Sequence, residues 1–235
     1  MEIQMKVKTV LGAAALFSSV LLQAQNIEVK ITNLTNGITY TPLLVASHKA
    51  DNSLFTVGTQ ASANLQAMAE GGDTSGLIVD LDNVGAIYAN NPAGGLLAPA
   101  TSTTANLDTQ DNDHLSIVAM LLPTNDGFVG LDSWPIPQEA GTYTVYLNGY
   151  DAGTEVNDEI INGGGAPGTA GIPADPQGNN GAGATGVATS EFNTNVHIHR
   201  GVIGDTDAAG GKSDLDARVH RWLNPVAEVT ITVGQ

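Results

Sequence analysis

The stretch HLSIVAMLL, from His114 to Leu122, decides the fold. After its first residue it is aliphatic throughout except for Ser116. A continuous apolar run of this length is typical of a strand that is buried on both faces. We therefore expect a central strand here, which ends at Leu122, where the loop PTNDGFVG (Pro123 to Gly130) begins.

Four other segments alternate apolar with polar residues, which is the period of a half-buried strand. They are NIEVKITNL (26–34), TYTVYLN (142–148), NVHIH (195–199) and VAEVTITV (226–233). Helical periodicity is weaker and is confined to Ser62 to Glu70 and to Ser213 to Leu223, the second of which starts from a good capping residue. Because strand patterns dominate, the sequence predicts an all-β fold, an antiparallel β-sandwich.

The segment from Gly163 to Val187 reads GGGAPGTAGIPADPQGNNGAGATGV and has almost nothing to bury. Its nine glycines and three prolines predict a long mobile loop. Strand patterns resume after it, so we expect one domain over residues 25–235 and not a linker between two domains. Two interpretations of this loop stay open: it is only a connection, or it lies beside whatever the preceding acidic segment binds.

The charge balance limits the partners. The 235 residues include 24 acidic and 8 basic ones, which gives a formal net charge of -16. Such a surface repels nucleic-acid phosphates and anionic lipid headgroups and attracts cations. We therefore expect neither nucleic-acid binding nor direct membrane binding. The sequence contains no cysteine, which excludes disulfides, thiolate metal ligands and a cysteine nucleophile.

The N-terminus predicts export. Lys6 and Lys8 precede an apolar run from Val10 to Leu22, which is too short to span a bilayer, and the small residue Ala24 follows. This pattern is typical of a secretory signal peptide, here over residues 1–24. We expect an exported bacterial protein, secreted or periplasmic; the alternative is a buried N-terminal strand or helix.

Two acidic loops suggest a cation site. Asp151 and Glu155 lie four residues apart, directly after the predicted strand 142–148, and Asn125 and Asp126 lie in the loop after the central strand. In an antiparallel sandwich two such loops can meet at the same end. Clustered carboxylate and carbonyl oxygens are the ligands that Ca²⁺ prefers. The alternative is that these are ordinary turn residues, for which Asp and Asn are common.

Several tracts resemble one known family, in the same order along the chain. They are YTPLLVASHKADNSLFTVGTQAS with LQAMAEGG, LSIVAMLLPTNDGFVGLDS, and YDAGTE. These tracts are similar to FSPLIGAVHN with LAExG, SFVxMIxPSPDWFVG, and DAGTD of the spondin N-terminal domain. The tail from VHIHRGVIGDTD onward resembles the ending of the bacterial members, so the resemblance covers nearly the whole mature chain.

The resemblance implies an eight-stranded antiparallel β-sandwich similar to C2 domains, with a Ca²⁺ held by Asp126, Asp151 and Glu155. Two positions depart from the family pattern: Gly127 replaces an aromatic residue, and Glu155 replaces an aspartate. Glutamate is a longer ligand that can bind Ca²⁺ through both oxygens, so we expect the site to persist with altered geometry. The resemblance also implies a secreted, non-catalytic adhesion or recognition module whose partner is an extracellular protein or a glycan.

Histidines provide an alternative hypothesis, a copper site. His197 and His199 lie two residues apart, which places them on one face of a strand, roughly 6.5 Å apart along it. This spacing is compatible with joint coordination of a transition metal, especially if His48 or His114 comes near. The other interpretation is that they are polar histidines on a solvated face, or hydrogen-bonded histidines at strand starts.

Familiar catalytic motifs are absent from the sequence. The patterns G-x-S-x-G, H-E-x-x-H and G-x-x-x-x-G-K-[ST] do not occur. Asp, Ser and His residues are present, but no pattern groups them. We therefore expect that the protein is not an enzyme.

Overall fold

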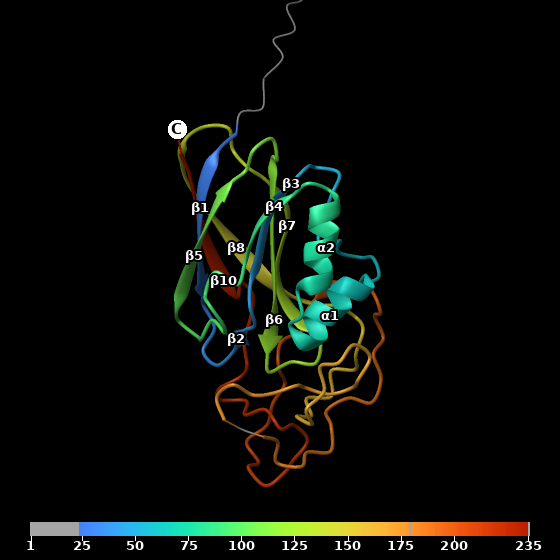
Figure 1. The fold of residues 1–235 in the computed structure, drawn as a ribbon. Coiled ribbons are helices and arrows are strands. Elements are labelled where there is room, and N and C mark those ends of the chain that lie inside the picture. The colour runs from blue at the N-terminus through green and yellow to red at the C-terminus, as the bar shows by residue number, and fades with distance from the viewer. Residues whose placement is uncertain (1–23, 179, 235) are drawn as a thin grey trace, which may run out of the picture.

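The computed structural model describes residues 24–178 and 180–234, so residues 1–23 of the predicted signal peptide lie outside the described residues. The described chain forms two helices and ten strands (Figure 1). In chain order they are β1 Asn26–Asn33, β2 Thr39–Tyr40, β3 Leu44–His48, α1 Ala63–Gly71, α2 Ser75–Asn83, β4 Ile87–Asn90, β5 Ser102–Asp108, β6 His114–Leu122, β7 Gly127–Pro135, β8 Gly141–Asp151, β9 His197–Ile198 and β10 Ala227–Val233. Among these residues, neither helix is long and apolar enough to cross a membrane.

The strands follow one path, β4-β3-β6-β7-β8-β10-β1-β5, in which every pair is antiparallel. Off this path, β2 pairs with β6 and β9 pairs with β8. Strand β8 connects the two halves, because its residues 141–147 pair with β10 and its residues 148–151 pair with β7. The end strands β4 and β5 lie next to each other, so the sheet is a nearly closed barrel.

The predicted all-β antiparallel class is confirmed, and the main path holds eight strands in the described part of the chain. The two separate sheets of a β-sandwich and a C2-like arrangement are not confirmed, because one continuous series of strand pairings runs through β8. The physical reason is the length of β8: a strand of 11 residues can pair with one neighbour at each end.

Strand β6 is central, as predicted, and lies between β3 and β7. Its side chains alternate between two apolar surroundings. Leu115, Ile117, Ala119 and Leu121 belong to the core inside the barrel, whereas Val118, Met120 and Leu122 pack in a second core with residues of the two helices. This burial on both faces explains why the sequence of β6 is continuously apolar.

The helices cover the outer face of β3, β6 and β7 on one side of the barrel (Figure 1). Helix α1 confirms the helix predicted over Ser62 to Glu70: Ser62 is the N-cap, and its side chain accepts a hydrogen bond from the backbone N–H of Leu65. Leu65 and Met68 bury its apolar face. Helix α2 was not predicted, because only Leu77 and Leu81 of its nine residues are fully buried and its pattern is correspondingly weak.

The turn or two of helix predicted over Ser213 to Leu223 is reduced, and no helix forms among these described residues. This segment makes a single turn, in which the backbone N–H groups of Val219 and His220 donate to the carbonyl of Asp216. The Asp216 carboxylate itself accepts from the backbone and the guanidinium of Arg218, and such local side-chain bonds compete with helix formation. Likewise, the strand predicted over residues 195–199 is reduced to the two residues of β9.

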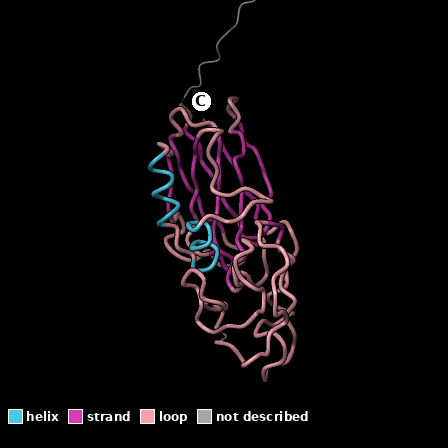
Figure 2. Tube along the Cα trace, turned by 90° about the vertical axis from the view of Figure 1, so that its right-hand side faces the viewer, coloured by secondary structure: helices cyan, strands magenta, loops and turns pink. Residues whose placement is uncertain are grey.

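Loops gather at one end of the barrel, where β6 ends and β7 begins (Figures 1 and 2). They come mainly from the chain between β8 and β10, in which β9 is the only described strand. The predicted candidate residues Asp126 and Asp151 lie at this end, because Gly127 pairs with Asp151 in the β7–β8 register. The termini of the described chain lie at the other end.

Burial of β6 on both faces predicts that truncation on either face is costly. Ile117→Ala and Met120→Ala, one on each face and both fully buried, should each lower the free energy of unfolding by about 2–4 kcal/mol. The exposed Ile198→Ala, at 48% exposure, should change it by less than about 1 kcal/mol. Urea unfolding measures all three, and a strand with one solvated face would show a small effect for one of the two core variants.

Candidate metal centre

Asp126 is the centre of the acidic end. It lies in the turn between β6 and β7 and is fully buried. Its Oδ2 accepts hydrogen bonds from the backbone N–H of Thr154 at 2.7 Å, from that of Glu155 at 3.1 Å and from the Thr154 hydroxyl at 3.2 Å. Its Oδ1 has no hydrogen-bond partner. The turn after β8 is therefore folded onto one oxygen of Asp126, and the other oxygen stays available.

Asp151, the last residue of β8, is 1% exposed. Its Oδ1 accepts from the backbone N–H of Gly153 at 2.8 Å, and its Oδ2 accepts from the side-chain amide of Asn157 at 2.7 Å. His197 Nε2 lies 3.9 Å from the same Oδ2. The structure thus brings Asp151 beside Asp126, as predicted, but both of its oxygens already have partners.

Glu155 is also buried, but its carboxylate has different surroundings. Its Oε2 accepts from the backbone N–H of Gly171 at 3.0 Å and, at 3.5 Å, from the side-chain amide of Asn125. Its Oε1 has no hydrogen-bond partner. The nearby charges that act on it are those of Glu70 and Asp158. Two of the three predicted ligands, Asp126 and Glu155, therefore each present one unused buried oxygen.

Glu70 belongs to this end and was missed by sequence reasoning. It is fully buried in the last turn of α1, where Oε1 accepts from Gln66 at 2.8 Å and Oε2 accepts from the backbone N–H of Gly168 at 2.6 Å. A negative charge at a helix C-terminus is unfavourable, and the last turn carries no basic residue. That misplaced charge, in LQAMAEGG, was the available signal in the sequence.

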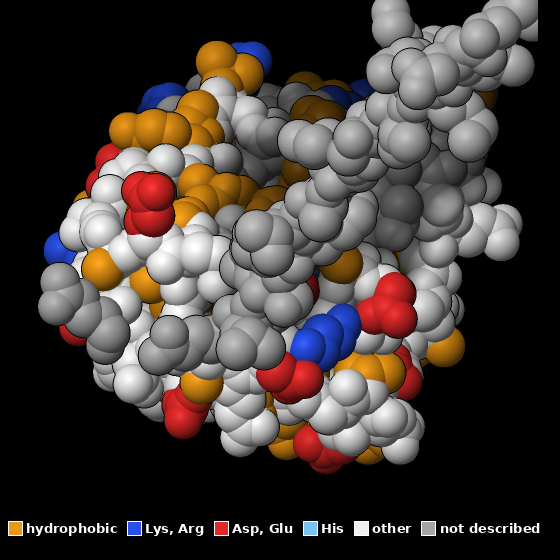
Figure 3. Space-filling view, turned by 90° about the horizontal axis from the view of Figure 1, so that it is seen from above, with side chains coloured by type: hydrophobic (Ala, Val, Ile, Leu, Met, Phe, Trp, Pro, Cys, Tyr) orange, Lys and Arg blue, Asp and Glu red, His pale blue; other side chains and the backbone are white. Residues whose placement is uncertain are grey.

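These four buried carboxylates have no Lys or Arg partner in the described chain, and the basic group beside them is His197, 3.9 Å from Asp151. In the part of the chain that the structure describes, the Lys and Arg ion pairs are Lys49–Asp111 and Arg218–Asp216, and neither involves these four carboxylates. Buried charges are normally paired or bound to a metal ion. At the opposite end, on the face that Figure 3 leaves uncovered, acidic side chains are scattered among polar, apolar and a few basic ones.

Burial and repulsion raise two pKa values. Burial, together with the charge of Asp151, raises the pKa of Asp126 to about 7, against hydrogen bonds from Thr154 and Glu155 that lower it. Burial also raises the pKa of Glu155 to about 7, with the charge of Glu70 acting in the same direction. Both carboxylates are thus costly to ionise where they lie, and a cation would offset that cost.

The donor atoms at this end are of the type that binds a hard cation. Carboxylate and carbonyl oxygens at flexible loops are what Ca²⁺ requires, and the unused oxygens of Asp126 and Glu155 are of this type. Over residues 24–178 and 180–234, however, no group of three or more His, Asp or Glu side chains is already arranged to hold a metal ion. The carboxylates are assembled at one end but do not close around a single point.

The histidines of the copper hypothesis form two separate pairs. His48 and His114 are partners in the β3–β6 register, with ring centroids 6.5 Å apart, at the start of β6. His197 pairs with Asp151 beyond the other end of β6. Nine residues of strand separate these ends, which is about 25 Å or more. The four side chains therefore do not converge.

Their ring nitrogens are also largely engaged. His48 donates from Nδ1 to the carbonyl of Lys49 at 2.9 Å and accepts at Nε2 from Ser116 at 2.7 Å. In His199, Nδ1 accepts from the backbone N–H of Gly201, Nε2 donates to Asn157, and burial lowers the pKa to about 4. His197 donates from Nδ1 to the carbonyl of Asn195. These hydrogen bonds match the non-metal interpretation of the histidines.

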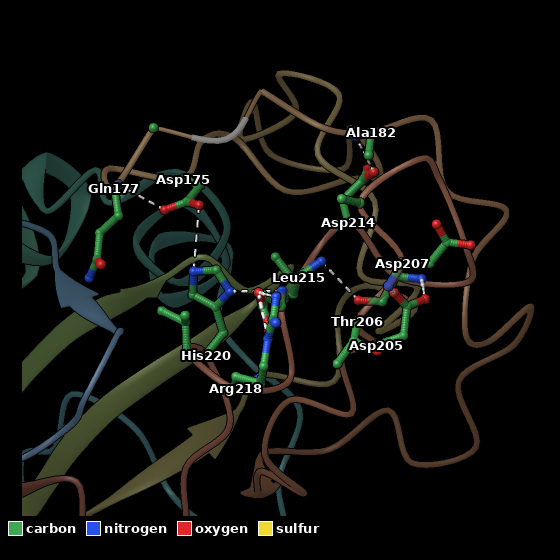
Figure 4. A pocket seen from close by; sticks show the side chains of 15 residues that line it. Asp175, Gln177, Ala182, Asp205, Thr206, Asp207, Asp214, Leu215, Arg218 and His220 are labelled. Atoms are coloured by element: carbon green, nitrogen blue, oxygen red, sulfur yellow. Dashed lines mark hydrogen bonds and ion pairs between the residues drawn. The ribbon is translucent and has the colours of Figure 1, made fainter.

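A cavity of about 490 Å³ in the loop region is also acidic (Figure 4). Its carboxylates are used to hold the loops: Asp205 accepts from the backbone of Asp207, Lys212 and Ser213, and Asp216 binds Arg218. His220 Nε2 lies 3.5 Å from Asp175 at the wall. These internal partners distinguish the cavity from the end that holds Asp126 and Glu155, where carboxylate oxygens are unused.

The fold and the acidic end define an antiparallel β domain with a carboxylate-rich loop end. The Spondin_N family model matches residues 32–158, more than half of the chain, and the chain belongs to this family. The matched region contains all four buried carboxylates, from Glu70 to Glu155, and ends before the glycine-rich segment. Strand β10, which pairs with both β1 and β8, lies beyond it. No curated protein matches the chain.

The raised pKa values predict that the cation-free protein loses stability as the pH rises. The folded-state pKa values of about 7 for Asp126 and Glu155 exceed the unfolded values of about 4. The protonated carboxyl groups therefore add to the free energy of unfolding in full below pH 4, and this addition is lost as the pH rises through 7. Urea unfolding in EDTA at pH 5 and pH 8 should show a decrease on the order of 3 kcal/mol.

Asp126→Asn should reduce this decrease, because the neutral amide has no ionisation penalty. Asp51→Asn, which removes an exposed charge, controls for the change in net charge and should leave the decrease unaltered. An equal pH dependence in the wild type and Asp126→Asn would contradict the assignment.

Proposed function

We propose that this protein is a secreted, calcium-binding module of the spondin type that acts in adhesion or recognition and has no catalytic activity. The observation that carries the proposal is the pair of unused buried oxygens, Asp126 Oδ1 and Glu155 Oε1, in a set of carboxylates without a Lys or Arg partner in the described chain. Family membership supports it, since residues 32–158 match the Spondin_N model. We also propose that the eight strands correspond to those of an eight-stranded, C2-like sandwich.

Asp126 and Glu155, which have the unused oxygens, are the residues proposed to hold the cation, with Asp151 and Glu70 adding negative charge beside them. Ca²⁺ suits them better than a soft transition metal, because every donor in the set is an oxygen. Mg²⁺ requires a strict octahedral geometry, which side chains from a helix and two loops meet less readily. The proposed cation would offset the repulsion that raises the pKa of Glu155.

Calcium would join three parts of the chain that are far apart in sequence. Glu70 lies in the last turn of α1, Asp126 lies in the β6–β7 turn, and Glu155 follows β8. Fixing these parts would give the loop end of the barrel one defined shape, which a recognition surface needs. The proposed partner is an extracellular protein or a glycan, and neither nucleic acid nor membrane is proposed, since the chain has a net charge of -16.

Calcium should raise the melting temperature of the protein at pH 8, and EDTA should reverse the effect. At a calcium concentration of 100 times Kd, binding to the folded state alone adds about 2.7 kcal/mol of stability. Glu155→Gln and Glu70→Gln should each remove most of this gain, because they keep the shape of the side chain and delete its charge. Glu139→Gln, on the exposed β7–β8 loop, is the matched control.

Differential scanning fluorimetry and calorimetric titration provide the readouts. Unchanged melting of the wild type with and without calcium would refute the proposal. Calcium stabilisation that survives in both Glu→Gln variants would place the cation elsewhere. Stoichiometric copper binding that is lost on His197→Ala and survives Asp126→Asn would favour the alternative, a copper-binding exported protein.

A further inference from the structure

Residues 162–171, the first part of the glycine-rich segment, form a loop whose two ends lie side by side. Ile161 and Ile172 are bridging partners, and the backbone N–H of Ile172 donates to the carbonyl of Ile160 at 2.8 Å. Both isoleucines are buried in the core of the barrel. The two ends of the loop are therefore held together in the core of the barrel.

The underside of this loop touches the carboxylate site. The backbone N–H of Gly168 donates to Glu70 Oε2, and the backbone N–H of Gly171 donates to Glu155 Oε2 at 3.0 Å. Residues 166–170 are exposed on the outer side. Only backbone groups of the loop make these two contacts, so the loop can bind both carboxylates while leaving Glu155 Oε1 unused.

Glycine is required where the loop passes the helix. A Cβ at Gly71, the last residue of α1, would collide with the carbonyl oxygen of Gly165. Gly171 has a φ of +115°, and a Cβ there would collide with the side chain of Asn162. The glycine-rich composition thus allows the backbone to approach α1 and Glu155 closely enough for its N–H groups to reach the carboxylates.

We propose that residues 162–171 are a lid over the carboxylate site and that closure of this lid and cation binding stabilise each other. The inference rests on the proposed function, since it assigns the lid to a calcium ion held by Asp126 and Glu155 beside Glu70. It goes beyond the family assignment, because residues 162–171 lie outside the matched region.

The coupling follows from the two carboxylates that the lid and the cation share. Without a cation, the charges of Glu70 and Glu155 repel each other, and this repulsion opposes the positions in which both accept from the lid. A cation on their other side removes the repulsion and holds both carboxylates where the N–H groups of Gly168 and Gly171 can reach them. By linkage, a closed lid must strengthen cation binding by the same factor.

Gly71→Ala tests the lid without changing a carboxylate. The added methyl group displaces the Gly165 carbonyl, and alanine is a better helix former than glycine. Gly141→Ala is the matched control, because a Cβ at Gly141 makes only ordinary contacts, the nearest at 3.4 Å. Calcium release into a fluorescent chelator, followed by stopped flow, should be roughly tenfold faster in Gly71→Ala than in wild type. Gly141→Ala should release calcium at the wild-type rate.

Hydrogen exchange of the unmutated protein provides a second, independent measurement. Calcium should slow the exchange of the amides at residues 168 and 171 and leave β5, remote from the site, unchanged. If the wild type binds calcium but the exchange of these amides and the release rate of Gly71→Ala do not change, the lid is refuted and the calcium site stands. If the wild type binds no calcium, both the lid coupling and the proposed function are refuted.

Discussion

Repulsion among buried carboxylates is the constraint on which the loop end of this barrel depends. Glu70, Asp126, Asp151 and Glu155 are each exposed by 6% or less, and none of them has a Lys or Arg ion-pair partner in the described chain. Their charge is met by N–H groups of the chain itself, which is the usual way to hold a buried anion. The turn after β8 donates to Asp126, and the loop 162–171 donates to Glu70 and Glu155.

The rest of the fold serves to position that set. Strand β6 is buried on both faces, because one face packs in the barrel core and the other packs against the helices. The β7–β8 register then brings Asp126 and Asp151 together, and α1 carries Glu70 to the same end. The turn from Ala152 to Glu155 folds onto Asp126 Oδ2. The proposed cation would offset the cost of this arrangement.

Local sequence patterns predicted the elements whose apolar residues recur with a regular period. Tertiary contacts determined the other elements. The alternation in β1, β8 and β10 and the apolar run of β6 were sufficient to predict strands, and the capped pattern of α1 predicted a helix. Strands β2 and β4 are too short to show a period. The segment predicted to be helical makes a single turn at Asp216, because the Asp216 carboxylate binds the backbone N–H of Arg218. The continuous path through β8 could not be read from any single segment.

For the site, spacing and resemblance identified Asp126, Asp151 and Glu155 and placed two of their loops at one end. They did not show that Asp151 has both oxygens engaged, because that depends on Asn157. Glu70 lies 56 residues before Asp126, and only the packing of α1 on the barrel brings it in. The role of the glycine-rich loop was equally hidden, since its contacts to Glu70 and Glu155 use backbone N–H groups, which every sequence has.

Metal content is the most direct test of the central claim. The purified protein would be equilibrated with equal concentrations of calcium, magnesium and copper at pH 8, desalted, and measured by inductively coupled plasma mass spectrometry. A cation held by the buried carboxylates predicts one calcium ion per chain in the wild type and loss of that ion in Glu155→Gln. Wild-type protein that retains no calcium, or that retains copper in its place, would contradict the account.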